Sequence, residues 1–148
     1  MDISIKKLTP ADANLFIQLL DLYKDVFAMT ASIYPPAAWS QQVLHDPAIT
    51  ILVALDDQKV IGGLTGYTLS SVYEPIKLMY LYDLGVSPAW QRQGVGTRLM
   101  QALLDQCSGA GISEVFVQAD LPDEHAIRFY TKNGGSREDV IHFSFSIK

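Results

Sequence analysis

The stretch of sequence that decides the fold reads Gln91-Arg92-Gln93-Gly94-Val95-Gly96. It follows a strand expected over residues 77–86 and precedes apolar residues at helical spacing that begin with Val95. Glycines 94 and 96 carry no Cβ, so a ligand can approach the backbone closely. Backbone N–H groups at a helix start present partial positive charge to a phosphate, to which Arg92 or Arg98 would add a formal charge. The stretch therefore predicts a phosphate-binding loop.

Two better-known phosphate loops fit this stretch less well. A dinucleotide fingerprint needs a third glycine at position 99, which is Leu99, and a Walker loop needs Gly-Lys-Ser/Thr where Gly96 is followed by Thr97-Arg98. Taken alone, a Gly-x-Gly before a helix is a weak signal, and a glycine-rich helix start that binds nothing is the alternative.

Strands and helices are expected to alternate on both sides of the loop. We expect strands at residues 3–8, 49–55, 60–69, 77–86 and 112–119, with 49–55 and 60–69 forming a hairpin. Helices are expected after Thr9 as the cap with Pro10 in the first position, over residues 37–45, from Val95 to Gly109, and after a capping Asp123. Glycines 62, 63 and 66 predict a bulge or a close approach within their strand.

The end of the chain shows strict alternation. Ile141, Phe143, Phe145 and Ile147 alternate with polar residues, which predicts a final half-buried strand. The sum is one domain over residues 1–148 with a mixed α/β sheet, antiparallel at first and joined by helical crossovers later.

Composition limits the classes of function. Hydrophobic residues make up 49% and charged residues 18% of the 148 residues, as in globular and not in disordered chains. No apolar stretch is long enough to cross a bilayer, no signal peptide is evident, and Cys107 is the single cysteine, so we expect a cytoplasmic protein without membrane association. The net charge of −5 disfavours nucleic acid and suits a cationic partner. No His/Cys spacing indicates a metal, and the sequence leaves the oligomeric state open, a homodimer included.

Two segments raise the specificity of the loop signal: Tyr-Leu-Tyr-Asp-Leu-Gly-Val-Ser-Pro over residues 80–88 and Ala-Ile-Arg-Phe-Tyr-Thr-Lys-Asn-Gly over residues 126–134. In this order and spacing, from about residue 49 to the end, the chain resembles the GNAT superfamily of N-acetyltransferases. Residues 91–96 match that superfamily's Q/R-x-x-G-x-G/A signature. The resemblance implies an α/β (α+β) fold with a mixed, mostly antiparallel sheet, flanking helices, and acetyl-CoA held where two neighbouring strands splay apart.

A closer resemblance concerns the acceptor. Residues 80–86, 117–120, 130–132 and 140–143 are similar to the aminoglycoside 3-N-acetyltransferases that modify gentamicin, which implies a small polycationic amino-sugar acceptor. Gln91 stands where many members have Arg, as the signature permits, and Gly135 stands where an aromatic residue often occurs.

The resemblance also implies roles for individual residues. It implies that Tyr130 protonates the departing thiolate and that the backbone of Leu84, Gly85 and Val86 contacts the reacting carbonyl and pantetheine, especially if a bulge occurs at Gly85. Spacing alone makes Tyr130 a core aromatic and residues 84–86 ordinary sheet. The cofactor-binding set continues through the loop: Gln91, Arg92, Gln93, Gly94, Val95, Gly96 and Thr97.

Carboxylates supply the candidates for handling the amine. Asp83 is expected to receive the amine's proton, directly or through water, although a carboxylate that satisfies a neighbouring group is the alternative. Candidates for binding the acceptor are Asp120, Asp123, Glu124 and Tyr34, with Asp21 and Asp25 as further ones; such acids are more often a solvated helix start. Other readings keep the fold but take a polyamine, an amino acid or a protein amine as acceptor, or make the chain a non-catalytic acyl-CoA-binding module.

Overall fold

The computed structural model describes residues 2–30 and 34–148, which fall into two compact units, residues 1–118 and residues 119–148. The first unit contains the whole sheet, and the second contains one helix and the C-terminal residues. The single domain expected over residues 1–148 stays a prediction.

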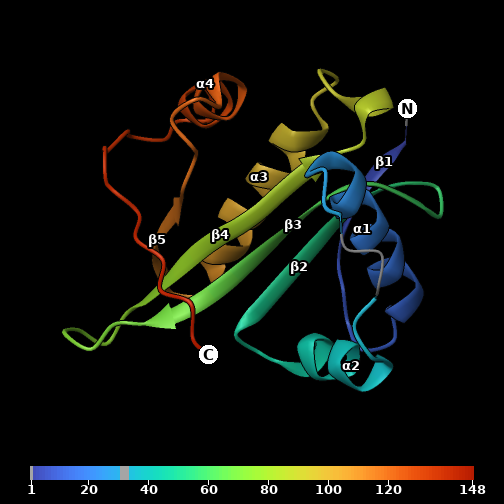
Figure 1. Cartoon of the computed structure of the whole chain (residues 1–148), viewed down its shortest axis with the longest axis horizontal. Coiled ribbons are helices and arrows are strands. Elements are labelled where there is room, and N and C mark those ends of the chain that lie inside the picture. Colours follow the sequence, from blue (N-terminus) through green and yellow to red (C-terminus); the bar gives the residue numbers. More distant parts are fainter. Residues whose placement is uncertain (1, 31–33) are drawn as a thin grey trace. The chain divides into compact units, whose positions relative to one another are not determined.

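The first unit is built on a five-stranded sheet in the order β1 (Ile3–Lys7), β2 (Ile49–Asp56), β3 (Lys59–Ser70), β4 (Lys77–Val86) and β5 (Ile112–Val117) (Figure 1). The first three pairings are antiparallel, and β4 and β5 are parallel. A parallel pair needs a crossover, which helix α3 (Val95–Gly109) provides. The expected mixed, mostly antiparallel α/β fold is therefore confirmed.

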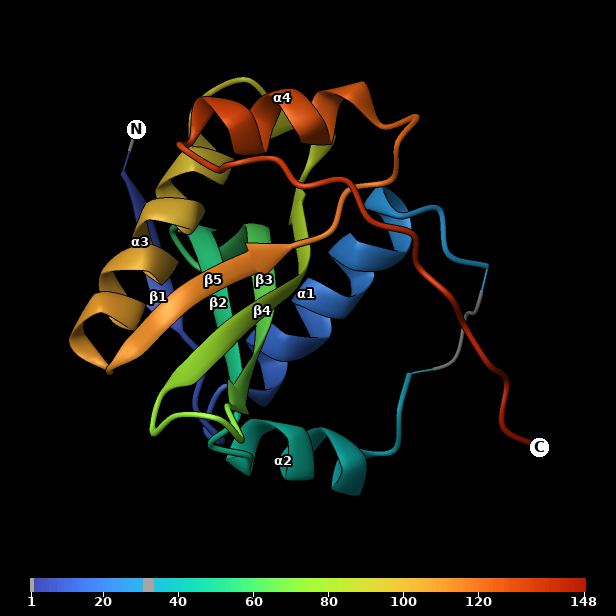
Figure 2. The ribbon, with the colours of Figure 1, turned by 90° about the vertical axis from the view of Figure 1, so that its left-hand side faces the viewer.

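Helix α1 (Ala13–Val26) covers one face of this sheet and α3 covers the other (Figure 2), while α2 (Ala37–His45) precedes β2. Successive glycines of β3 allow both approaches: a Cβ on Gly63 would overlap the Leu19 side chain of α1, and one on Gly62 would lie 3.2 Å from Val95 Cγ1 of α3. The close approach predicted from these glycines is confirmed. Among the described residues, no helix is long and apolar enough to span a membrane.

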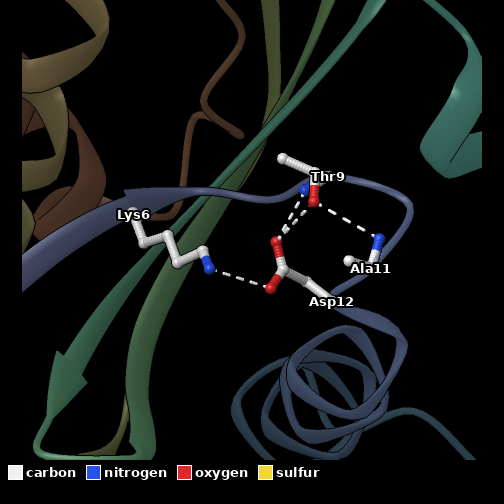
Figure 3. Close-up of polar contacts among 4 residues, drawn as sticks. All are labelled: Lys6, Thr9, Ala11 and Asp12. Atoms are coloured by element: carbon white, nitrogen blue, oxygen red, sulfur yellow. Dashed lines mark hydrogen bonds and ion pairs between the residues drawn. The ribbon is translucent and has the colours of Figure 1, made fainter.

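The start of α1 differs from the sequence prediction (Figure 3). Asp12, and not Thr9, occupies the cap position, and Pro10 lies in the turn before the helix. The Asp12 carboxylate points back along the chain, where it accepts hydrogen bonds from Thr9 N at 2.8 Å and Thr9 Oγ1 at 3.1 Å and pairs with Lys6 Nζ at 2.9 Å. These bonds close a turn that delays the helix to Ala13 and hold the pKa of Asp12 below its usual value, chiefly through Lys6.

The second unit contains helix α4 (Glu124–Lys132). The predicted cap is confirmed, because Asp123 Oδ1 accepts a hydrogen bond from Ala126 N at 3.1 Å. The predicted final strand is wrong: residues 135–148 form neither helix nor strand, and Phe143 and Phe145 are 74% and 85% exposed. A strand needs a neighbouring strand for its N–H and C=O groups, and no strand occurs among residues 119–148.

Candidate functional site

An opening between β4 and β5 is the first feature of the site. The two strands pair from Lys77 opposite Ile112 to Leu81 opposite Val117, and residues 82–86 of β4 extend beyond the last pair. On its other edge β4 stays paired with β3 as far as Val86 opposite Gly62. Within the described sheet, the backbone of residues 82–86 therefore has a strand neighbour on one side only. Apart from the Val86 carbonyl, which accepts a hydrogen bond from Gln91 Nε2, its outer polar groups are available to a ligand.

A bulge in β4 decides which side chains lie on the sheet face beside this opening. Asp83 lies opposite Thr65, but Leu81 lies opposite Gly66, so Tyr82 is an extra residue in β4. No bulge occurs at Gly85, the position at which one would have freed further N–H groups, since Gly85 pairs regularly with Gly63. The extra residue interrupts the alternation of β4, so Asp83, opposite Thr65, lies on the same face as Tyr80, opposite Tyr67.

The loop that follows β4 runs through a short 3-10 helix, Pro88–Trp90, into α3. Two of its side chains brace it, because Gln91 Nε2 donates to the Val86 carbonyl and Gln93 Nε2 donates to the Ala89 carbonyl, both at 3.0 Å. Arg92 and Gly94 adopt the left-handed conformation, with φ of +61° and +85°. The loop is thus held in a defined shape by bonds that the sequence pattern alone did not show.

The start of α3 offers donors and open space. Gly94 occupies the cap position, and no side chain among the described residues caps the helix there. The first N–H groups of a helix have no partner within it, so those of Val95, Gly96 and Thr97 face outward. A Cβ built on Gly94 would meet nothing within 4 Å. The geometry fits an anionic group such as a phosphate, and chain continuity brings the predicted cofactor residues 84–86 and 91–97 to one end of β4.

Asp83 ends a chain of polar groups that begins in α1. The buried Tyr23 hydroxyl lies 2.9 Å from Thr65 Oγ1, and Thr65 of β3 is the register partner of Asp83. Burial raises the pKa of Asp83, and the bond from Thr65 partly opposes that rise. Burial also raises the pKa of Tyr23 far above its usual value, so the phenol keeps its proton. Sequence reasoning gave neither Thr65 nor Tyr23 a place in the site.

The remaining N-terminal candidates lie on the surface of the first unit. The Tyr34 phenol donates a hydrogen bond to Asp21, and Lys24 Nζ lies 3.7 Å from the centre of the Tyr34 ring. Asp21 and Asp25 help to line an open depression of about 310 Å³ that ends at Ser87, just past β4. The Asp21 carboxylate therefore already accepts a hydrogen bond from Tyr34. The depression that Asp21 and Asp25 line still leaves space for a ligand beside them.

The other candidates belong to the second unit. Tyr130 is half-buried in α4, its ring packs edge-on against Phe129 with centroids 5.2 Å apart, and its carbonyl accepts a bond from Gly135 N at 2.9 Å. A Cβ at Gly135 would lie only 3.0 Å from that carbonyl, which accounts for glycine at this position. Asp120, Asp123 and Glu124 are exposed. The described residues contain no cluster of side chains arranged to hold a metal.

Comparison with known proteins adds to this geometry. The sequence profile of the acetyltransferase (GNAT) family matches residues 16–135. An aminoglycoside acetyltransferase from an uncultured soil metagenomic sample, solved in complex with sisomicin, is 37% identical with a TM-score of 0.96, and the alignment covers 99% of this chain and 97% of that one. A second aminoglycoside acetyltransferase from an uncultured soil metagenomic sample is 31% identical with a TM-score of 0.95 over the full length of both chains. The uncharacterised N-acetyltransferase YhfO of Bacillus subtilis is 22% identical over 145 residues, which are 97% of each chain.

Proposed function

Because the chain belongs to the acetyltransferase (GNAT) family, we propose that it transfers the acetyl group of acetyl-CoA to an amine of a small polycationic acceptor of the aminoglycoside type. GNAT acetyltransferases use acetyl-CoA. The observation that carries the proposal is the opening of β4 away from β5, followed directly by the uncapped start of α3. The end of β4 thus offers backbone groups that have no strand partner, and the start of α3 just after it offers N–H donors for a phosphate.

The residues fit acetyl-CoA in two places. The N–H groups of Val95, Gly96 and Thr97 would bind the pyrophosphate, since helix starts favour anions and Gly94 leaves the approach clear. The outer backbone groups of residues 84–86, other than the Val86 carbonyl that Gln91 already bonds, would hydrogen-bond the amide-containing pantetheine arm as a strand neighbour would. When bound, acetyl-CoA supplies an acetyl group activated as a thioester. Gln91 and Gln93 would act by shaping the loop, because their side chains already bond backbone carbonyls.

Asp83 is the group that would receive a proton from the acceptor. An amine attacks only in its neutral form, so the site needs a base whose pKa approaches the working pH. Burial moves the pKa of Asp83 in that direction. Thr65, whose hydroxyl lies 2.9 Å from that of Tyr23, is the register partner of Asp83 and would help to position its carboxylate. Asp83 would therefore orient the ammonium group and accept its proton.

The acceptor class rests on the solved relatives. Two solved aminoglycoside acetyltransferases are 37% and 31% identical to this chain over nearly its whole length. The net charge of −5 suits a polycation. The proposed roles of Tyr130 as acid, and of Asp120, Asp123 and Glu124 as ammonium ligands, stay predictions that mutagenesis can test.

The test is thiol release from acetyl-CoA with a panel of amines: gentamicin, sisomicin, spermidine, free amino acids and a peptide. We expect kcat/KM for the aminoglycosides to exceed that for the others and to fall as salt rises. Release with a peptide or amino acid alone would refute the aminoglycoside acceptor and leave acetyl transfer in place. No release with any amine, despite acetyl-CoA binding by calorimetry, would refute catalysis and favour an acyl-CoA-binding module.

A further inference from the structure

Four aromatic rings form a continuous row across the sheet next to Asp83. Phe116 of β5 and Tyr80 of β4 are register partners and stack with centroids 4.7 Å apart at 12°. Tyr82 packs edge-on against Tyr80 and against Tyr67 of β3, with both centroid distances at 5.6 Å. We refer to Tyr67, Tyr82, Tyr80 and Phe116 as the aromatic row. Its position follows from the bulge, which adds Tyr82 to β4 beside Asp83.

The row is partly open to solvent. Tyr82 is 61% exposed, and the other three rings are half-buried. Tyr82 is also the first residue of β4 beyond the last β4–β5 pair, so the row includes a ring at the start of the opening between the two strands. A packing role alone would favour burial of a large ring, and an exposed aromatic surface beside a site is a common means of ligand binding.

The rings are neutral, and a carboxylate stands next to them. Burial, together with the charge of Asp83, raises the pKa of both Tyr67 and Tyr80, so their phenols stay protonated at neutral pH. The Tyr80 hydroxyl is held by Gln118 Oε1 at 2.7 Å, which fixes the plane of that ring. Neutral aromatic faces attract ammonium groups and pack against saturated rings, while the carboxylate attracts the same ammonium group.

We propose that the aromatic row is the acceptor platform: it binds a saturated, aminated ring of the acceptor by stacking and cation–π contacts and presents the ring's amine to Asp83. This inference rests on the proposed function and names the part of the site that would select ring-bearing polyamines over flexible ones. An open-chain polyamine can offer ammonium groups to carboxylates, but it has no ring face to stack on Tyr82.

The exposed ring of Tyr82 makes the platform testable without loss of the fold. Tyr82→Ile removes the ring and keeps a strand-forming apolar side chain, whereas Tyr82→Phe keeps the ring and loses only the hydroxyl. Tyr73→Ile is the matched control, because Tyr73 is 92% exposed in the turn between β3 and β4. Calorimetry would measure binding of gentamicin and spermidine, and thiol release would measure kcat and KM for both.

We expect Tyr82→Ile to weaken gentamicin binding and raise its KM roughly threefold to thirtyfold, the range of an exposed to partly desolvated cation–π contact. Its kcat and its acetyl-CoA affinity should stay at wild-type values, and its spermidine affinity should fall less than its gentamicin affinity, because spermidine has no ring face to stack. Tyr82→Phe and Tyr73→Ile should behave as wild type. The platform is refuted if Tyr82→Ile leaves gentamicin binding unchanged, weakens spermidine equally, or if wild type does not bind gentamicin. Gentamicin that binds through Tyr82 but is not acetylated would support the platform and refute the proposed function.

Discussion

A pair of substitutions at Gly94 separates phosphate binding from helix stability. Gly94 has a φ of +85° and open space where a Cβ would lie, so a side chain there meets strain but no clash. Asn and Asp tolerate the left-handed conformation better than other residues and have nearly the same shape. Gly94→Asn and Gly94→Asp should therefore share a backbone cost of up to about 1 kcal/mol and differ only in one negative charge.

That charge should act in opposite directions on folding and on binding. At the start of α3 a carboxylate stabilises the helix dipole by about 0.3–1 kcal/mol, so Gly94→Asp should unfold at a higher temperature than Gly94→Asn. Toward a pyrophosphate of two charges about 6 Å away, an effective dielectric constant of about 40 corresponds to roughly 2.8 kcal/mol of repulsion. Screening at physiological salt about halves this, so the Kd for acetyl-CoA should rise about tenfold relative to Gly94→Asn, and up to a hundredfold at low salt.

The assay is titration calorimetry of acetyl-CoA at two salt concentrations, with thermal unfolding of each variant. Gly111 is the matched control, since it follows the other end of α3, has a φ of +73° and also has open space around its Cβ direction. Gly111→Asp should lower Tm relative to Gly111→Asn, because it places a negative charge near the helix C-terminus, and should leave the Kd unchanged. Equal acetyl-CoA affinity of Gly94→Asp and Gly94→Asn at low salt would refute the phosphate site.

Three further predictions concern catalysis and packing. Asp83→Asn should lower kcat about a hundredfold or more with a smaller change in KM. It should also remove the acid limb of the pH profile of kcat/KM, which in the wild type lies above the usual aspartate pKa because burial raises the pKa of Asp83. An unchanged pH profile would exclude Asp83 as the base. Because the pKa of Asp83 is raised in the folded state, the protonated carboxyl stabilises the fold at low pH, and this stability is lost as the pH rises through the folded pKa and the buried group becomes charged. Asp83→Asn should therefore raise Tm more at pH 7 than at pH 4 in thermal unfolding. Tyr130→Phe should keep Tm and acetyl-CoA affinity while kcat falls about a hundredfold, and a wild-type kcat would leave Tyr130 a packing residue. Gly63→Ala should destabilise the fold by about 1–3 kcal/mol through overlap with Leu19, measured by urea unfolding, and an unchanged stability would mean that α1 can shift away from the sheet.

The local features of this protein were readable from its sequence. Helix α2 and strand β4 have the predicted bounds, and Asp123 caps α4 as expected. The paired glycines at a helix start identify the loop over residues 91–96. These features depend on residues close together in the chain, whose turn chemistry and periodicity act before any long-range contact forms.

Tertiary structure decided the features that depend on pairing. The bulge at Tyr82, which places Asp83 on the same face as Tyr80, follows from the register of β4 against β3, and no local sequence pattern marks it. Thr65 and Tyr23 are 42 residues apart and meet only because α1 covers that face of the sheet. A register shift by one residue moves a side chain to the opposite face of the sheet. Which side chains share a face of β3, β4 and β5 is therefore decided by strand pairing and not by composition.

The C-terminal residues show that alternation in the sequence does not by itself produce a strand. Phe143 and Phe145 alternate with polar residues as strand residues do, yet they are exposed and form no strand. Alternation determined which side chains would share a face if residues 141–147 became a strand. Whether a strand forms depends on a partner for its N–H and C=O groups, and only the folded arrangement of the chain supplies or withholds that partner.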